Sequence, residues 1–190
     1  MNKPLLYVNA CVRKESRTET LAKKLLLKLE QPYEEINLKE TDLPKVDEDY
    51  LNMRDGLVFG GDLKNSVFDL ARQFAKAETI VIAAPFWDLS FPAVLKQYLE
   101  LVNVVGITFK YTENDVVEGL CKAKRLFYVT TAGGNNIPEE YGFGYIKALA
   151  QNYYGIQDVR KIEATGLDIY GADVNAIMKS AEDAINKLDL

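Results

Sequence analysis

The 190-residue chain predicts an α/β protein built on a doubly wound, five-stranded parallel sheet. Segments of strand type alternate with segments of helix type along its whole length. Several strand segments are uninterrupted apolar runs, as expected for strands that are buried on both faces. Alternating strands and helices form parallel βαβ units with right-handed crossovers. We therefore expect a single domain over residues 1–190 with the strand order 2-1-3-4-5.

The first part of the chain contains two strands and two helices. A short apolar run at residues 5–11 predicts a strand, and leucines at helical spacing predict a helix over residues 18–29. Residues 33–38 are typical of a second strand. Residues 39–64 combine proline and glycines with many charges, so we expect mostly loop and at most a short helix. Apolar residues at helical spacing predict the next helix over residues 67–77.

The second part of the chain continues the alternation. Residues 79–84 are apolar after Thr79 and predict the most deeply buried strand. Pro92 occupies the favoured first position of a helix that we expect over residues 92–105. The remaining predicted elements are strands at residues 126–131 and 159–164 and helices at residues 139–154 and 173–188.

Composition excludes several functional classes. The formal charge of −5 disfavours nucleic acids and membrane surfaces as partners, because both attract a basic face. No apolar run approaches the ~20 residues of a membrane span, and no signal-peptide pattern precedes the first strand. Cys11 and Cys121 are far apart, which predicts reduced thiols and a cytoplasmic location. The chain has no histidine, which excludes Ser-His-Asp and Cys-His catalysis and disfavours a zinc site.

The segment between the first strand and first helix has the features of a phosphate site. In a doubly wound sheet, ligands bind beyond the carboxyl ends of the strands. Ser16, Arg17 and Thr18 would offer hydroxyls, a guanidinium and backbone N–H groups to a terminal phosphate at a helix start. The alternative is that Ser16 or Thr18 is only a helix cap and Arg17 is solvated. No Gly-Lys-Ser/Thr motif supports a triphosphate-binding loop.

Two further loops follow the third and fourth predicted strands. Residues 85–92, Pro-Phe-Trp-Asp-Leu-Ser-Phe-Pro, hold aromatic side chains that should cover a flat apolar ligand or another subunit. Packing against the next helix is the alternative. Residues 130–136, Thr-Thr-Ala-Gly-Gly-Asn-Asn, contain paired glycines that let the backbone approach a ligand closely. An ordinary turn is the alternative there.

Together these segments resemble the FMN-dependent NADH-azoreductase and NAD(P)H–quinone reductase family, which has a flavodoxin-like fold. The resemblance covers nearly the whole chain. Its most specific part is Ala-Pro-Phe-Trp-Asp-Leu-Ser-Phe-Pro-Ala-Val-Leu-Lys-Gln-Tyr at residues 84–98. Gly-Ile-Thr-Phe-Lys-Tyr-Thr at residues 106–112 and Glu-Gly-Leu at residues 118–120 extend it.

The resemblance implies non-covalent FMN. Residues 16–18 would hold its phosphate, residues 86–89 would run along the isoalloxazine edge, and residues 131–134 would contact the pyrimidine end. The family often has Ser where Cys11 stands and Asn where Asp88 stands, so a hydroxyl and an amide donor are lost here. The cofactor-binding residues predicted in this way are Cys11, Ser16, Arg17, Thr18, Pro85, Phe86, Trp87, Asp88, Leu89, Thr131, Ala132, Gly133 and Gly134.

The resemblance also implies an activity and an assembly. NADH or NADPH would transfer a hydride and leave, and a quinone, azo or nitro aromatic acceptor would then take its place, in a ping-pong sequence. Because the flavin carries the chemistry, we expect no indispensable acid, base or metal ligand from the protein. Aromatic residues within 87–91 and 109–111 would leave an apolar patch on a monomer, and the family forms dimers, so we expect a homodimer.

Two alternatives belong to other functional classes. One is a flavodoxin-type FMN electron carrier, which has no substrate pocket of its own. The other is a receiver-like domain without flavin, which needs an acidic pair after the first strand. Asn9-Ala10-Cys11 offers no such pair. A yellow protein would exclude the receiver, and turnover of NADH with a quinone would distinguish an enzyme from a carrier.

Overall fold

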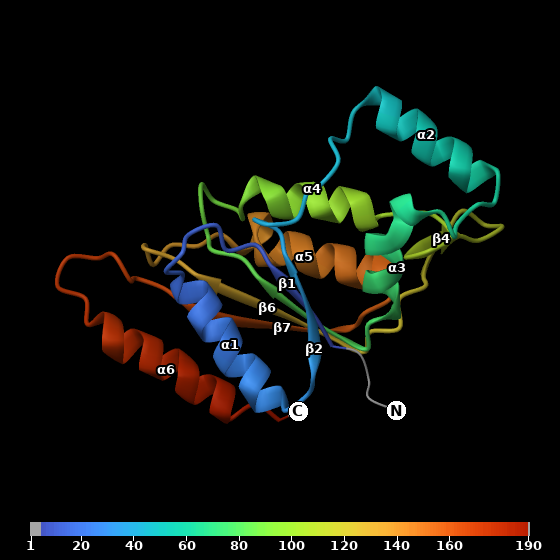
Figure 1. Cartoon of the computed structure of the whole chain (residues 1–190). Helices are drawn as coiled ribbons and strands as arrows, with labels where there is room; N and C mark the ends of the chain where they lie inside the picture. Colours follow the sequence, from blue (N-terminus) through green and yellow to red (C-terminus); the bar gives the residue numbers. More distant parts are fainter. Residues whose placement is uncertain (1–4, 190) are drawn as a thin grey trace.

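A five-stranded parallel sheet forms the centre of the computed structural model, which describes residues 5–189 (Figure 1). Its strands follow the order β2-β1-β3-β6-β7. Because β4 and β5 lie outside this sheet, the order is equivalent to the predicted 2-1-3-4-5. The strands are β1 (Leu5–Asn9), β2 (Tyr33–Asn37), β3 (Thr79–Ala83), β6 (Arg125–Thr131) and β7 (Asp158–Ala164).

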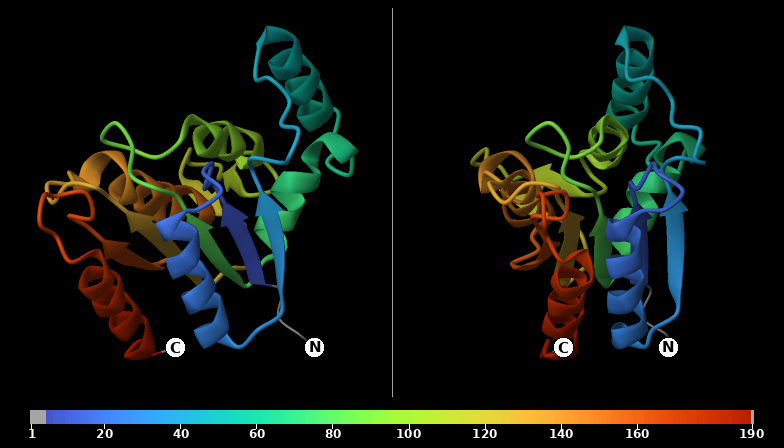
Figure 2. Two further views of the ribbon diagram at one scale, coloured as in Figure 1. Left: turned by 60° about the vertical axis from the view of Figure 1, so that its left-hand side comes forward. Right: turned by 90° about the vertical axis from the view of Figure 1, so that its left-hand side faces the viewer.

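Helices cover both faces of the sheet (Figures 1 and 2). One face packs against α1 (Arg17–Leu29) and α6 (Val174–Asn186), and the other against α3 (Asp69–Lys76), α4 (Ala93–Val102) and α5 (Phe143–Leu149). Each face has its own cluster of buried apolar side chains. Burial on both faces confirms the interpretation of the apolar strand segments.

The start of α1 is fixed by a side-chain cap. Ser16 has extended backbone angles, and its hydroxyl accepts a hydrogen bond from the Glu19 N–H at 3.2 Å. Glu19 also places a carboxylate in the first turn, where the helix dipole favours negative charge. Leu21 and Leu25 are fully buried against the sheet. The cap and the leucine spacing therefore explain why the predicted helix forms here.

The helix α4 is shorter than predicted. It begins after Pro92 and ends at Val102, whereas we expected residues 92–105. The reason is Thr108, whose buried hydroxyl donates to the Val102 carbonyl at 2.8 Å and accepts from the Val104 N–H at 3.1 Å. These bonds satisfy the backbone at the helix end and turn the chain away.

The expectation of mostly loop at residues 39–64 was wrong for about half of that segment. It contains the twelve-residue helix α2 (Glu48–Phe59), which projects from the body of the molecule (Figure 2). The Asp47 side chain caps this helix by accepting from the Tyr50 N–H at 3.1 Å. Only Tyr50 of the helix is buried, so the apolar periodicity that marks packed helices is absent.

Two further elements differ from expectation. The strands β4 (Phe109–Tyr111) and β5 (Val117–Gly119), which were not predicted, form a separate antiparallel hairpin. The predicted helix at residues 139–154 consists of a 3₁₀ turn, η2 (Glu139–Tyr141), then α5, then a π-helical turn, η3 (Ala150–Tyr154). No helix within residues 5–189 is both long and apolar enough to cross a membrane.

Strand register brings four loops to one edge of the sheet. Asn9 at the end of β1 lies opposite Ala83 of β3, and Thr131 of β6 lies opposite Ala164 of β7. The chain leaves β1 toward β2 on one side, whereas β3 lies on the other side. The gap between β1 and β3 is therefore the switch point at which sheets of this kind bind ligands.

Candidate functional site

A cavity of about 510 Å³ opens at this switch point. Its volume lies within the roughly 300–1,000 Å³ range of small-molecule and cofactor sites. Loops after β1, β3, β6 and β7 all contribute to it. The lining residues are Val12, Arg13, Glu15, Ser16, Arg17, Thr18, Thr20, Pro85, Phe86, Trp87, Thr131, Ala132, Gly133, Leu167 and Asp168.

The first turn of α1 forms one end of the cavity. An α-helix leaves the N–H groups of its first turn without intrahelical acceptors, here those of Arg17 and Thr18. The Ser16 hydroxyl accepts from the Glu19 N–H and keeps its own hydrogen to donate. Partial positive charge at a helix start and the Arg17 guanidinium together favour an anion.

Thr18 lines the cavity, but its hydroxyl is engaged within the protein. Its side chain is 1% exposed, and its Oγ1 lies 2.6 Å from the Oγ1 of Thr131 in a buried hydrogen bond. The pair joins the start of α1 to the end of β6 beneath the cavity. Thr18 therefore positions the helix start through its side chain and can offer a ligand its backbone N–H.

Arg17 and Asp168 form an ion pair across the cavity rim. The Arg17 Nη1 donates to Asp168 Oδ1 at 2.8 Å, and the two side chains are 46% and 69% exposed. Asp168 follows β7, and its backbone N–H donates to the Gly133 carbonyl at 3.0 Å. This bond ties together the loops after β6 and β7.

An aromatic wall forms another side of the cavity. Pro85 is buried, and Phe86 and Trp87 are half-buried and line the cavity. The Arg13 guanidinium lies 5.7 Å from the centre of the Trp87 ring, within cation–π range. The wall is thus apolar along the loop after β3 and positively charged where that loop meets the loop after β1.

Asp88 and Leu89 lie outside the lining of the cavity. Trp87 and Ser90 exchange two backbone hydrogen bonds, of 2.9 and 2.8 Å, around a turn with Asp88 and Leu89 at its tip. Both tip residues have left-handed backbone angles, with φ of 50° and 68°. This conformation is costly for a residue with a Cβ, and for leucine in particular. Both side chains are exposed.

The loop after β6 meets the cavity through Thr131, Ala132 and Gly133, whereas Gly134 is exposed and outside the lining. A Cβ at Gly133 would lie 2.4 Å from Asp168 Oδ2, so a larger residue there would displace the Asp168 carboxylate from its present position. Nothing lies within 4 Å of a Cβ at Gly134. Of the two glycines, therefore, only Gly133 faces a neighbouring side chain.

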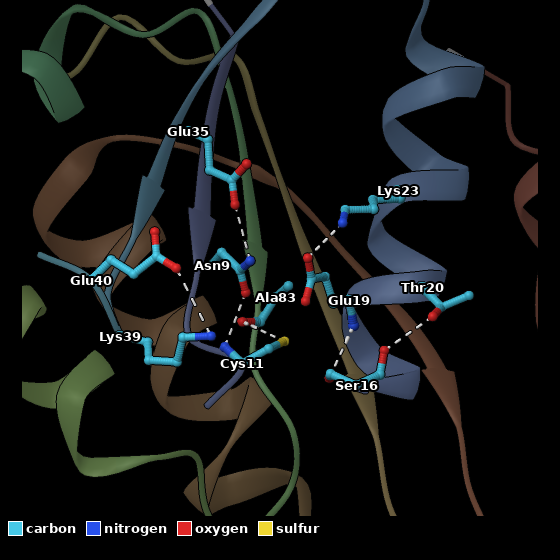
Figure 3. A network of polar contacts seen from close by, with 10 residues as sticks. All are labelled: Asn9, Cys11, Ser16, Glu19, Thr20, Lys23, Glu35, Lys39, Glu40 and Ala83. Atoms are coloured by element: carbon cyan, nitrogen blue, oxygen red, sulfur yellow. Dashed lines mark hydrogen bonds and ion pairs between the residues drawn. The ribbon is translucent and has the colours of Figure 1, made fainter. Parts of the chain in front are cut away.

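Cys11 lies beside the cavity and is turned toward β3 (Figure 3). Its side chain is 2% exposed, and its Sγ is 3.8 Å from the Ala83 carbonyl oxygen. Its backbone N–H donates to Asn9 Oδ1 at 3.0 Å, and Asn9 Nδ2 in turn donates to Glu35 at 3.0 Å. Burial raises the pKa of the Cys11 thiol to about 11. Cys11 does not line the cavity.

We expect both cysteines to be unreactive in the native protein. Burial also raises the pKa of the Cys121 thiol, to about 12, and the thiolate is the reactive form. At pH 8 less than about 1% of either thiol is ionised. Iodoacetamide at pH 8 should therefore modify neither residue on the timescale at which it modifies both in urea, as followed by mass spectrometry. Rapid native modification of Cys11 would contradict its burial.

Sequence reasoning missed Asp168 and Arg13 as cavity residues. Asp168 lies four residues beyond the end of β7, at the same edge of the sheet as the three predicted loops. A polar residue shortly after the fifth strand was the available signal. Arg13 precedes the predicted phosphate segment, and its packing on Trp87 depends on a tertiary contact between two loops.

Comparisons with known proteins identify the family. Residues 3–188 match a protein family described as having a flavodoxin-like fold. An FMN-dependent NADH:quinone oxidoreductase of Clostridium perfringens strain SM101 is 36% identical over 184 residues, which are 92% of each chain. That of Clostridium beijerinckii is 36% identical over 192 residues, or 96% of each chain. The chain belongs to the flavodoxin-like family that contains these quinone oxidoreductases.

Solved structures confirm the flavodoxin-like fold of this family member. An FMN-dependent NADH-azoreductase from Bacillus anthracis str. Ames Ancestor, in complex with FMN, matches with a TM-score of 0.82 at 23% identity. The match covers 97% of this chain and 96% of that chain. An azoreductase from Bacillus anthracis str. Sterne gives 0.84 at 22% identity, with 97% of each chain covered.

Proposed function

We propose that the protein is an FMN-dependent oxidoreductase that transfers two electrons from NADH or NADPH to quinones, azo compounds or nitro aromatics. The observation that carries this proposal is that three segments line the same cavity at the switch point. They are a helix start that favours anions, an aromatic loop and a glycine-containing loop. Relatives that match over more than nine-tenths of their length are named FMN-dependent NADH:quinone oxidoreductases. We also propose that residues 1–190 form a single FMN-binding domain.

The residues of the cavity suit a flavin nucleotide. The start of α1, with the Ser16 hydroxyl and the Arg17 guanidinium, would hold the terminal phosphate. Phe86 and Trp87 would flank the ring system, and Gly133, which lines the cavity without a side chain, would let backbone groups of the loop after β6 reach the ligand. Bound FMN supplies two-electron hydride chemistry that side chains lack.

The protein's own contribution is binding, orientation and exclusion of water. The turn at Asp88 and Leu89 is closed by two backbone hydrogen bonds, and Ser90 Oγ donates to the Tyr141 carbonyl at 2.6 Å. The Ser90 side-chain bond holds the aromatic loop against η2, which precedes α5. The side chains lining the cavity include no histidine or cysteine. Glu15 and Asp168 are the carboxylates in the lining. Because protons can come from solvent and FMN would supply the hydride chemistry, we assign no acid–base role to a side chain.

The test of this function is direct. Purified protein should be yellow, and denaturation should release FMN in a ratio of one per chain. NADH or NADPH oxidation should depend on added quinone, with parallel double-reciprocal plots as a ping-pong sequence requires. Colourless protein that also fails to bind added FMN would refute the proposal. Bound FMN without quinone-dependent turnover would instead favour an electron carrier.

We also propose a cytoplasmic homodimer. Both cysteines are unpaired, as in a reducing compartment. The projecting helix α2 ends at Phe59, whose side chain is 89% exposed, and Leu89 and Tyr111 are each 53% exposed. Phe109, by contrast, is buried within the protomer and adds nothing to such a patch. Met53, also on α2, is 42% exposed, and exposed apolar side chains that gather on one projecting helix are the kind of surface that another subunit covers.

Sedimentation should therefore give a mass near twice 21.4 kDa. Changing Phe59 to Asp should shift the equilibrium toward the monomer, because it places a charge in the covered surface. Leu27→Asp, the same kind of apolar-to-charged change at a 73% exposed position on α1, serves as the control and should leave the dimer intact. A wild-type protein that stays monomeric at high concentration would contradict the proposal.

A further inference from the structure

The Arg17 guanidinium is the positive group best placed to bind an anionic ligand, but it is paired with the Asp168 carboxylate. Arg17 is the first residue of α1, and Asp168 lies 151 residues further along the chain. Both residues line the same cavity. One of the protein's own carboxylates, that of Asp168, thus lies at the end of the cavity where the free N–H groups of α1 lie.

The backbone of Asp168 is fixed by hydrogen bonds to a neighbouring loop. Its loop forms three backbone hydrogen bonds with the loop after β6, from Gly166, Leu167 and Asp168 to the carbonyls at residues 134, 132 and 133, at 2.9, 3.1 and 3.0 Å. Its carboxylate lies over Gly133, since a Cβ there would be 2.4 Å from Oδ2. The carboxylate is therefore a built part of the cavity, although much of its side chain is exposed.

The charge of Asp168 opposes that of an incoming phosphate. A phosphate monoester would use the Arg17 guanidinium and the start of α1, both of which favour negative charge. Asp168 already occupies one donor of that guanidinium. We propose that Asp168 competes with the flavin phosphate for Arg17 and so limits the affinity for FMN relative to flavins that lack a phosphate. This inference rests on the proposed function, because it takes FMN as the ligand.

The experiment compares FMN and riboflavin binding to cofactor-free protein by fluorescence titration. Asp168→Asn should tighten FMN binding about two- to fivefold, within the range expected for breaking an exposed ion pair. Riboflavin affinity should change less than about twofold, because riboflavin carries no phosphate. Glu182→Gln is the matched control: it removes the same charge from Glu182 of α6, the half-buried partner of Lys24 of α1, and both residues lie outside the cavity. It should change neither affinity.

The double variant Arg17→Ala/Asp168→Asn tests whether the effect passes through Arg17. In the Arg17→Ala background, Asp168→Asn should tighten FMN binding less than it does in the wild type, because only the repulsion between the carboxylate and the phosphate is then removed. Unchanged or weaker FMN binding by Asp168→Asn would overturn the inference, as would an equal change for riboflavin or full tightening without Arg17. If wild-type protein binds no flavin, the proposed function itself fails. If wild-type protein binds FMN and Asp168→Asn does not change the affinity for FMN, only the inference fails.

Discussion

Replacing Arg17 with alanine should weaken FMN binding by at least about tenfold, because a hydrogen bond to a charged group contributes about 1.5–3 kcal/mol. The change removes the guanidinium at the start of α1 and also leaves the Asp168 carboxylate at the cavity rim without its partner. Both consequences disfavour a bound phosphate. Riboflavin affinity should hardly change, since its interactions with the aromatic loop remain.

Lys24→Ala is the matched control for this prediction. Lys24 belongs to the same helix and pairs with Glu182 at 3.6 Å, but it lies outside the cavity. Its loss should leave FMN affinity within about twofold, because a surface charge beyond roughly 10 Å is largely screened at 0.1 M salt. Equal weakening of FMN and riboflavin by Arg17→Ala would show that Arg17 acts through the fold, and not on the phosphate.

The sheet was predictable because its strands carry their signal locally. An apolar run such as residues 79–84 is expected to form a strand that is buried between two layers of helices, and it does so in the structure. The helix α2 lacked such a signal, since it buries only Tyr50 and so shows no apolar stripe. Its start was nevertheless encoded, with Asp47 as cap and Glu48 and Asp49 in the first turn.

The site was predictable as loops and less so as side chains. Strand order alone brings the segments after β1, β3 and β6 together, and nine of the thirteen predicted residues line the cavity. The other four are Cys11, Asp88, Leu89 and Gly134. Cys11 is buried beside β3, and the turn geometry directs Asp88 and Leu89 outward. Such orientations depend on φ, ψ and contacts between loops, which spacing along the chain does not encode.

The hairpin β4–β5 also escaped prediction, and its packing depends on one glycine. The backbone of Gly119 in β5 lies against the end of η3: a Cβ there would be 2.2 Å from the Gly155 nitrogen and 2.5 Å from the Tyr154 carbonyl oxygen. These are backbone atoms and cannot rotate away. Tyr154 is itself fixed, because its ring packs on Phe74 at 4.8 Å and its hydroxyl donates to Asn103 at 2.6 Å.

Gly119→Ala should therefore lower the free energy of unfolding by about 3 kcal/mol, the upper part of the usual range for overpacking. For a chain of this size that corresponds to a fall in Tm of about 6–12 °C. Urea and thermal unfolding of the cofactor-free protein measure the effect.

Gly56→Ala is the control. Gly56 lies inside α2 with no atom within 4 Å of an added Cβ, and alanine is favoured over glycine in a helix. It should leave stability unchanged or slightly raised. A Gly119→Ala variant as stable as the wild type would mean that the hairpin does not pack on η3 as closely as these contacts require.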